Sequence, residues 1–249
     1  MILHHLSWDV AIIGAGLSGL STAKDLTKAG KFFVILEAQE RVGGRVLNIH
    51  LPNGGITEAG TEFVGPTQDR VLLLAEELGL QTYPTYTAGK DILYRNGTAS
   101  LFSGDLASGG YRRFNPLLSS SSAEWDSITF KEWADKEAPH PDAKFLLGLA
   151  STSVLSTETW EPSLLYTLAY IATAGNETTK GTLERLTGVQ NAAQEKRIVG
   201  GTQLLAVQLA QRLGLENIVF NSPVPLIKQI GDQYVVVADG DRMGRLWAS

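Results

Sequence analysis

Three glycines near the start of the chain have the spacing of a phosphate-binding turn. Gly14, Gly16 and Gly19 follow the apolar run 10–13, and the residues after them have apolar side chains at helical spacing. The first glycine would allow a sharp turn, the second a close approach of a diphosphate, and the third tight packing of the helix on the strand. We therefore predict a dinucleotide-binding turn between a strand at 10–13 and a helix that ends at Gly30.

A carboxylate stands where such a turn needs one. Glu37 ends a second apolar run, 32–36, about 20 residues after the glycines, where these folds place an acid that accepts hydrogen bonds from a ribose. The same carboxylate would repel a 2′-phosphate, which disfavours NADP. The alternative is a glycine-rich turn from strand to helix that binds no ligand.

The composition is that of a globular protein and excludes several classes of site. The chain has 249 residues, of which 43% are hydrophobic and 19% charged, so it can bury a sizeable core. The net charge of −5 argues against nucleic acid or an anionic membrane as the main partner. The absence of cysteine excludes disulfides and thiolate chemistry, and the scattered histidines do not have the spacing of metal ligands.

Membrane segments and targeting signals are not expected. The apolar stretches 145–155 and 163–174 are shorter than the roughly 20 residues of a membrane span, so we expect buried helices there. The first strand begins too early to leave room for a signal peptide, which indicates an intracellular, cytoplasmic protein. An organelle address beyond the last residue remains compatible with this expectation.

Turn residues and periodicity predict the other elements. Thr67 is expected to cap a helix that ends at Gly79, and residues 84–127 are expected to form irregular, exposed loops. Residues 130–186 have a helical pattern. The remaining expectations are a tight turn at 52–55, a helix at 204–213, a strand at 218–220 and a hairpin formed by 226–230 and 234–237.

Four separate segments, in order, resemble the flavin-containing monoamine oxidases. They are Ala11-Ile-Ile-Gly-Ala-Gly-Leu-Ser-Gly-Leu20, Leu36-Glu-Ala-Gln-Glu-Arg-Val-Gly-Gly-Arg45, Ala59-Gly-Thr-Glu-Phe-Val-Gly-Pro-Thr-Gln68 and Gln194-Glu-Lys-Arg-Ile-Val-Gly-Gly201. The similarity extends from about residue 8 to about residue 238 and corresponds to the N-terminal half of the family's chain.

The resemblance implies FAD as cofactor and assigns residues to it. Arg45 would reach the phosphates, Gly60 and Thr61 would bring backbone near the flavin ring, and the backbone of Val224 would pair with adenine. A surface arginine and an ordinary strand valine are the alternatives. The full set of implied cofactor residues is Gly14, Ala15, Gly16, Ser18, Gly19, Glu37, Ala38, Arg45, Gly60, Thr61 and Val224.

On the substrate side the resemblance implies Gln194 and Tyr170. Together with Tyr166, Leu183 and Leu186, the tyrosine could line an apolar tunnel, although core packing explains the same helical spacing. Gln194 could equally be a solvated polar residue. No catalytic residue can be assigned, because the family's flavin-facing lysine and paired tyrosines would lie beyond the last residue.

The resulting expectation is an α/β protein with a Rossmann-like FAD-binding domain and an inserted, mostly helical substrate domain, incomplete at the C-terminus. The expected boundaries are 1–83 and 196–249 for the FAD-binding domain and 84–195 for the substrate domain. The implied reaction oxidises a small-molecule amine to an imine and then an aldehyde, with oxygen as acceptor and with release of ammonia and hydrogen peroxide. The alternatives are a non-catalytic FAD-binding fragment and a flavoprotein related to desaturases or porphyrinogen oxidases.

Overall fold

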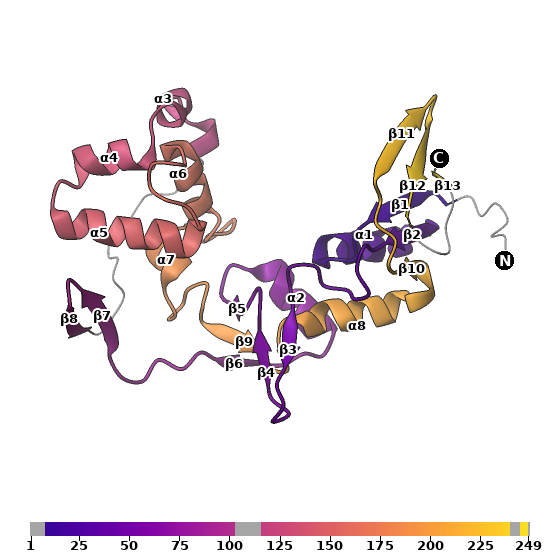
Figure 1. Ribbon diagram of the computed structural model, residues 1–249, viewed down its shortest axis with the longest axis horizontal. Coiled ribbons are helices and arrows are strands. Elements are labelled where there is room, and N and C mark those ends of the chain that lie inside the picture. Colours follow the sequence, from indigo (N-terminus) through magenta and orange to yellow (C-terminus); the bar gives the residue numbers. More distant parts are fainter. Residues whose placement is uncertain (1–7, 103–115, 240–244, 249) are drawn as a thin grey trace. The chain divides into compact units, whose positions relative to one another are not determined.

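The computed structural model describes residues 8–102, 116–239 and 245–248. The chain divides into two compact units, and Figure 1 labels the α-helices and β-strands of both. Unit 1 comprises Met1–Glu62, Leu74–Gln81 and Ile198–Ser249, and unit 2 comprises Phe63–Leu73 and Thr82–Arg197.

A parallel sheet forms the centre of unit 1. Its strands are β1 (Val10–Ile13), β2 (Phe33–Leu36) and β10 (Ile218–Val219), and β2 lies between the other two. All four residues of β2 are buried, as expected for a strand of a parallel sheet that is covered on both faces. The predictions of these strands are confirmed, with two differences at their ends: β2 begins one residue later than expected, with Phe32 outside the strand and exposed, and β10 ends one residue earlier.

Two helices pack against each other beside this sheet. Helix α1 (Leu17–Lys28) connects β1 to β2, and α8 (Gln203–Leu213) precedes the short 3₁₀ helix η3 (Leu215–Asn217) and β10. Their buried side chains recur at helical spacing, with Leu20 and Ala23 in α1. Gly30 has a φ of 66°, so the predicted end of α1 is confirmed.

Antiparallel strands complete unit 1. The hairpin of β11 (Leu226–Ile230) and β12 (Gln233–Val237) confirms the prediction, and β13 (Arg245–Ala248) pairs with β12. The strands β3 (Asn48–His50) and β4 (Ile56–Glu58) flank the predicted turn at 52–55. The parallel sheet and the antiparallel sheet that contains β12 share a core cluster of Val34, Leu36, Val236 and Ala238.

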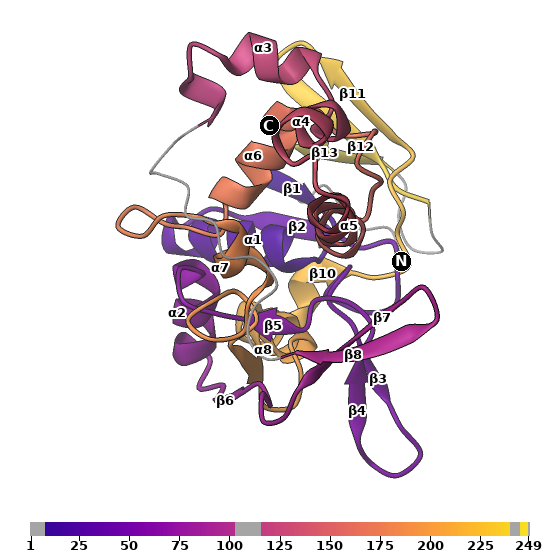
Figure 2. The same cartoon turned by 90° about the vertical axis from the view of Figure 1, so that its left-hand side faces the viewer.

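Unit 2 is mainly helical from residue 116 onward, which confirms the helical prediction for 130–186 (Figure 2). Its helices are η1 (Pro116–Leu118), α3 (Ser122–Ser127), α4 (Phe130–Glu137), α5 (Pro141–Ala150), the π-helix η2 (Ser151–Leu155), α6 (Leu164–Ala172) and α7 (Leu183–Thr187). Helix α6 buries Leu164 and Thr167. The expectation that 145–155 is a buried helix is only partly correct, because no residue of α5 is fully buried.

Short strands form the rest of unit 2. Strand β9 (Lys196–Ile198) lies between β5 (Phe63–Val64) and β6 (Thr82–Pro84). The expectation of irregular loops over 84–127 is wrong for part of that segment, because β7 (Asp91–Arg95) and β8 (Thr98–Phe102) form a hairpin. Its turn is Asn96-Gly97, whose φ values of 51° and 78° fit the two central positions of a type I′ turn.

The predicted cap at Thr67 is also wrong. Helix α2 (Asp69–Glu77) begins two residues later, and the N–H groups of Val71 and Leu72 donate to the carbonyl of Gln68. Thr67 has a φ of 80°, and its hydroxyl donates to the carbonyl of Ala174 at 2.9 Å. The Thr67 side chain therefore makes a tertiary hydrogen bond instead of the helix cap that the local sequence predicts. Gly79 ends the helical segment as expected.

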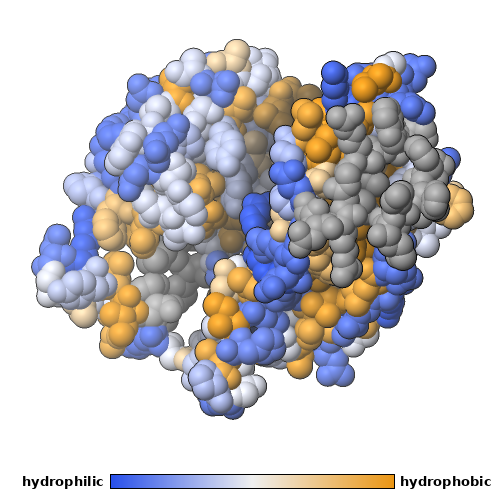
Figure 3. Space-filling model, turned by 45° about the vertical axis from the view of Figure 1, so that its right-hand side comes forward, coloured by the Kyte–Doolittle hydropathy of each residue, from blue (hydrophilic) through white to orange (hydrophobic). Residues whose placement is uncertain are grey.

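Apolar side chains also reach the exterior. Leu226, Ile227 and Tyr234 of the β11–β12 hairpin are about half exposed, at 51%, 53% and 48%. Apolar surface lies among hydrophilic surface on the face shown in Figure 3.

Candidate cofactor site

The glycine turn joins the end of β1 to the start of α1. Gly14 has a φ of 96°, and its N–H donates to the carbonyl of Leu36 at 2.8 Å. A Cβ on Gly19 would lie 2.1 Å from the carbonyl oxygen of Gly14, so only glycine allows this approach of helix and turn. A Cβ on Gly16 would have its nearest neighbour 4.0 Å away, at the carbonyl oxygen of Gly43. The turn is thus tightly packed at Gly19 and open at Gly16.

The start of α1 is an open group of hydrogen-bond donors. Gly16 occupies the N-cap position, and within the described part of the chain no side chain caps the helix. The first turn contains no acidic residue, and the Ser18 side chain in it is exposed. These features fit an anionic group held by backbone N–H groups and the helix dipole.

Glu37 is buried at the end of β2, with 7% of its surface exposed. One carboxylate oxygen accepts the N–H of Ala15 at 2.7 Å and the other accepts the N–H of Gln39 at 2.8 Å. An ionised carboxylate has about four lone-pair sites, so capacity for ribose hydroxyls remains. The carboxylate therefore has a structural task that its sequence position did not indicate: it holds the glycine turn against β2. Ala38, the next implied residue, is exposed.

A second glycine-containing turn, residues 41–46, lies against the first. The N–H of Gly43 donates to the carbonyl of Ala15 at 2.9 Å. The Arg41 guanidinium donates to the Gly44 carbonyl at 3.1 Å and so closes the turn on itself. Arg45 is exposed and has no ion pair or hydrogen bond among the described residues. Its guanidinium is free to bind an anion.

The third implied segment, residues 59–61, touches this turn. A Cβ on Gly60 would lie 1.9 Å from the carbonyl oxygen of Arg45, so the two loops are in backbone contact. The N–H of Ala59 donates to the carbonyl of Leu47 at 2.9 Å. The structure therefore brings residues 14–19, 41–46 and 59–61 together in unit 1.

Val224 lies between β10 and β11. Its side chain is partly buried and packs on the cluster that contains Val34 and Val236. Within the described ranges its backbone N–H and C=O make no hydrogen bond, while the neighbouring Pro223 carbonyl accepts the N–H of Asp239 at 2.8 Å. The side chain has a core role, and the backbone remains available, as the predicted adenine contact requires.

Sequence reasoning missed four polar residues that hold these loops. Asn48, Glu58, Thr202 and Gln203 bond to one another and to the loops across more than 100 positions of sequence. Thr202 and Gln203 directly follow Gly200-Gly201 and precede an amphipathic helix. Their place between a glycine pair and a helix could have marked these two residues as candidates, but the neighbouring sequence does not indicate which distant residues they bond to.

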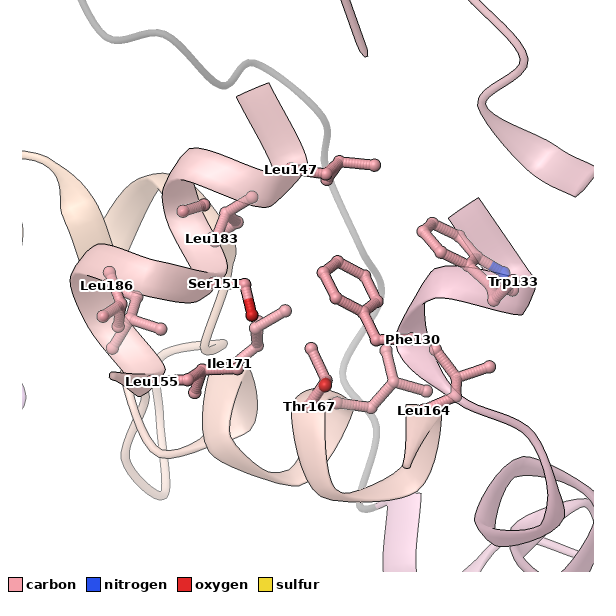
Figure 4. Close-up of a pocket in the computed structure, with 13 residues that line it drawn as sticks. Phe130, Trp133, Leu147, Ser151, Leu155, Leu164, Thr167, Ile171, Leu183 and Leu186 are labelled. Atoms are coloured by element: carbon pink, nitrogen blue, oxygen red, sulfur yellow. The ribbon is translucent and has the colours of Figure 1, made fainter. Parts of the chain in front are cut away.

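Unit 2 contains an apolar cavity of about 60 Å³ among α4, α5, η2, α6 and α7 (Figure 4). Its two polar lining residues turn their hydroxyl groups to backbone, Ser151 to the carbonyl of Thr157 and Thr167 to that of Ser163. The cavity surface is consequently almost wholly apolar. The lining residues are Phe130, Trp133, Leu147, Ala150, Ser151, Val154, Leu155, Leu164, Thr167, Leu168, Ile171, Leu183 and Leu186.

The implied substrate residues divide in their relation to this cavity. Leu183 and Leu186 line it, whereas Tyr166, Tyr170 and Gln194 do not. The rings of the two tyrosines lie 6.3 Å apart, and the Gln194 carbonyl accepts the hydroxyl of Thr85 at 2.7 Å. The substrate roles of Tyr170 and Gln194 remain predictions.

Within the described ranges, no three side chains of His, Cys, Asp or Glu are grouped so that they could hold a metal ion. In the same part of the chain, no helix combines the length and the apolarity that crossing a membrane requires.

Comparison with known proteins identifies the family. The family model for flavin-containing amine oxidoreductases matches residues 17–245. The chain is 32% identical over 250 residues to flavin-containing amine oxidase A of Sus scrofa and 31% identical over 249 residues to flavin-containing amine oxidase B of Rattus norvegicus. Each match covers 92% of this chain and 46% of the relative, so the chain spans about half the length of these curated relatives.

Solved structures agree with these sequence matches. A putrescine oxidase bound to putrescine superposes with a TM-score of 0.84 at 28% identity, over 98% of this chain and 57% of the other. Cyclohexylamine oxidase from Brevibacterium oxydans superposes with a TM-score of 0.84 at 25% identity, over 98% of this chain and 56% of the other. These matches confirm the α/β FAD-binding fold and the flavin cofactor that the resemblance implied. The chain belongs to the family of flavin-containing amine oxidoreductases.

Proposed function

We propose that this chain supplies the FAD-binding part of an amine oxidase. The observation that carries the proposal is the convergence of residues 14–19, 41–46 and 59–61 in unit 1, with Gly43 bonded to Ala15 and Gly60 against Arg45. When bound, FAD would supply the two-electron oxidant: a neutral amine would give up a hydride and become an iminium ion, water would hydrolyse this ion to an aldehyde and ammonium, and oxygen with one further proton would take the hydride equivalent as hydrogen peroxide.

The residues present fit the diphosphate and ribose of FAD. The open position at Gly16 leaves room for the diphosphate, and the uncapped start of α1 offers N–H donors to it. The exposed Ser18 hydroxyl and the unpaired Arg45 guanidinium would donate further hydrogen bonds to phosphate oxygens. Glu37 would use its remaining lone pairs for the adenosine ribose.

The remaining contacts concern the two ring systems. Val224 would offer its backbone N–H and C=O to adenine, because neither is bonded within the described residues. The backbone of Gly60 and Thr61 would lie near the flavin ring, in a loop where the first of these residues has no space for a side chain. This assignment extends from one end of the cofactor to the other.

Unit 2 is proposed as the substrate-facing, inserted helical domain. Its apolar cavity would favour the neutral form of an amine, because an apolar environment lowers the pKa of an ammonium group. The nitrogen lone pair is then available for oxidation. Tyr170 and Gln194, which lie outside the lining of that cavity, are proposed as further substrate-side residues on the family resemblance alone. The similarity to putrescine oxidase and cyclohexylamine oxidase favours a small aliphatic or cyclic amine as the substrate class.

The test is spectroscopic. The purified chain is supplied with FAD, freed of unbound flavin, and mixed with benzylamine or a short alkylamine without oxygen. Bleaching of the flavin band, followed by hydrogen peroxide when air is admitted, is the expected result. A flavin band that persists with every amine would leave a non-catalytic FAD-binding chain or a desaturase-like flavoprotein, and a folded but colourless protein would refute FAD binding as well.

A further inference from the structure

We propose that Thr202 and Gln203 are positioning residues for the cofactor: they fix the backbone of two FAD-binding loops from the start of α8. We call this pair the α8 clamp. The inference rests on the proposed function, since the loops concerned, residues 41–46 and 59–61, are those assigned to FAD above. It assigns a role in cofactor binding to two polar side chains that lie far from the glycine turn in the sequence.

Gln203 holds the first loop with both ends of its amide. Its Nε2 donates to the carbonyl of Val42 at 3.0 Å, and its Oε1 accepts the N–H of Asn48 at 2.8 Å. Its Cγ would lie 3.3 Å from a Cβ on Gly43, so the stem of the side chain lies against the turn. One side chain thus holds the turn that contains Arg45, at Val42 within the turn and at Asn48 two residues beyond it.

Thr202 holds the second loop in the same way. It is 1% exposed, and its N–H donates to Oε1 of Glu58 at 2.7 Å. Its hydroxyl lies 2.8 Å from the same carboxylate oxygen and also contacts the carbonyl oxygen of Thr61. Glu58 and Thr61 flank Ala59 and Gly60, so this contact sets the span of the loop.

The Thr202 hydroxyl is committed to the loop and not to its own helix. A threonine at the N-cap position ordinarily accepts an N–H from the first turn of the helix. Thr202 stands at that position of α8 with φ −65° and ψ −24°, and its side chain caps no helical N–H. Helix stability alone therefore does not explain this hydroxyl.

The two loops also depend on each other. The Arg45 carbonyl would lie 1.9 Å from a Cβ on Gly60, and Gly43 is bonded to Ala15 of the glycine turn. A shift of either loop is therefore transmitted to its neighbour. Because hydrogen bonds to a cofactor depend on donor position to within a few tenths of an ångström, loosening the clamp would weaken FAD binding.

The experiment compares isosteric variants for FAD affinity, by quenching of flavin fluorescence, and for the visible circular dichroism of bound FAD. Thr202→Val keeps the shape and removes the hydroxyl, Thr202→Ser restores the hydroxyl, and Gln203→Met removes both amide contacts. Thr27→Val is the matched control, because the Thr27 hydroxyl only donates to the Ala23 carbonyl within α1.

We expect Thr202→Val and Gln203→Met to weaken FAD binding about tenfold and to change the flavin dichroism, since each leaves buried polar groups without partners. Thr202→Ser and Thr27→Val should bind FAD as the unmodified chain does. Unchanged affinity and dichroism in a folded Thr202→Val variant would overturn the inference. If that variant does not fold, Gln203→Met decides in the same way, and if it does not fold either, the pair is needed for folding and the positioning role is rejected. A folded, unmodified chain that binds no FAD would instead refute the proposed function.

Discussion

Replacing Gly19 or Gly16 with alanine separates what the glycine turn does for folding from what it does for the cofactor. At Gly19 the new methyl group would lie 2.1 Å from the carbonyl oxygen of Gly14 and 3.2 Å from Cγ2 of Ile12. At Gly16 the nearest atom would be 4.0 Å away, and the φ of −73° is one that alanine readily adopts. The same change of residue therefore meets a closed position and an open one.

The magnitudes follow from these contacts. Alanine gains about 1 kcal/mol over glycine in a helix interior, and at most that at Gly19, which is the third residue of α1. At Gly19 the methyl group must move about 1 Å from a backbone oxygen, and overpacking of this kind costs about 1–3 kcal/mol or more, so we expect a net loss of stability. At Gly16 the change at an N-cap position costs about 0.5–1 kcal/mol, but the methyl group would occupy the space assigned to the diphosphate.

The assay is urea unfolding combined with FAD titration of each variant. Gly148→Ala is the stability control, because this α5 glycine has no atom within 4 Å of the new methyl group and should gain about 1 kcal/mol. Gly16→Ala should remain close to the unmodified chain in stability and lose FAD affinity. A Gly19→Ala chain as stable as the unmodified one, or a Gly16→Ala chain with full FAD affinity, would refute the reasoning.

Three further predictions concern unit 2. Hydrogen bonds from Lys131 and Lys144 lower the pKa of Asp135 from 3.8 to about 2. The Asp135 carboxylate therefore stabilises the fold above pH 3.8 and ceases to do so as the pH falls through 2. The difference in melting temperature between the unmodified chain and Asp135→Asn should shrink over that window, and a constant difference would contradict the contact. Leu164→Ala, at 3% exposure beside the cavity, should cost about 2–5 kcal/mol in urea unfolding, and a loss below 1 kcal/mol would show that the cavity wall collapses freely. Gly97→Ala should destabilise the β7–β8 hairpin by about 1–2 kcal/mol because of its φ of 78°, seen as faster amide exchange in β7 and β8, whereas unchanged exchange would argue against the type I′ turn.

Elements with a strong local signal could be predicted from the sequence. The apolar run 10–13 and the glycine turn after it are sufficient for β1 and the start of α1, and Gly30 marks the end of that helix. The β11–β12 hairpin was equally clear, because two alternating runs flank a turn dipeptide. In each case a few neighbouring residues contain the whole physical cause.

The errors arose where the cause lies elsewhere or where composition hid it. Thr67 bonds to Ala174, which is 107 positions away, so no local rule could assign its hydroxyl. The Asn96-Gly97 turn had a hairpin signal, but the glycine-rich and serine-rich composition of 84–127 masked it.

The candidate site shows the same division. The positions of Gly14, Gly16, Gly19 and Glu37 follow from their sequence pattern, but the second function of the Glu37 carboxylate, on the N–H of Ala15, does not. The contacts of the α8 clamp join residues 141–161 positions apart, as in the bond from Gln203 to Val42, and only the folded chain reveals them.

Equilibrium titration of the purified chain with FAD tests the central claim most directly, that residues 14–19, 41–46 and 59–61 form one cofactor site. We predict saturable binding of one FAD per chain, with loss of affinity in Arg45→Met, because that guanidinium has no other partner among the described residues. A chain that is folded by circular dichroism and takes up no FAD, or that binds it equally well without Arg45, would contradict the account.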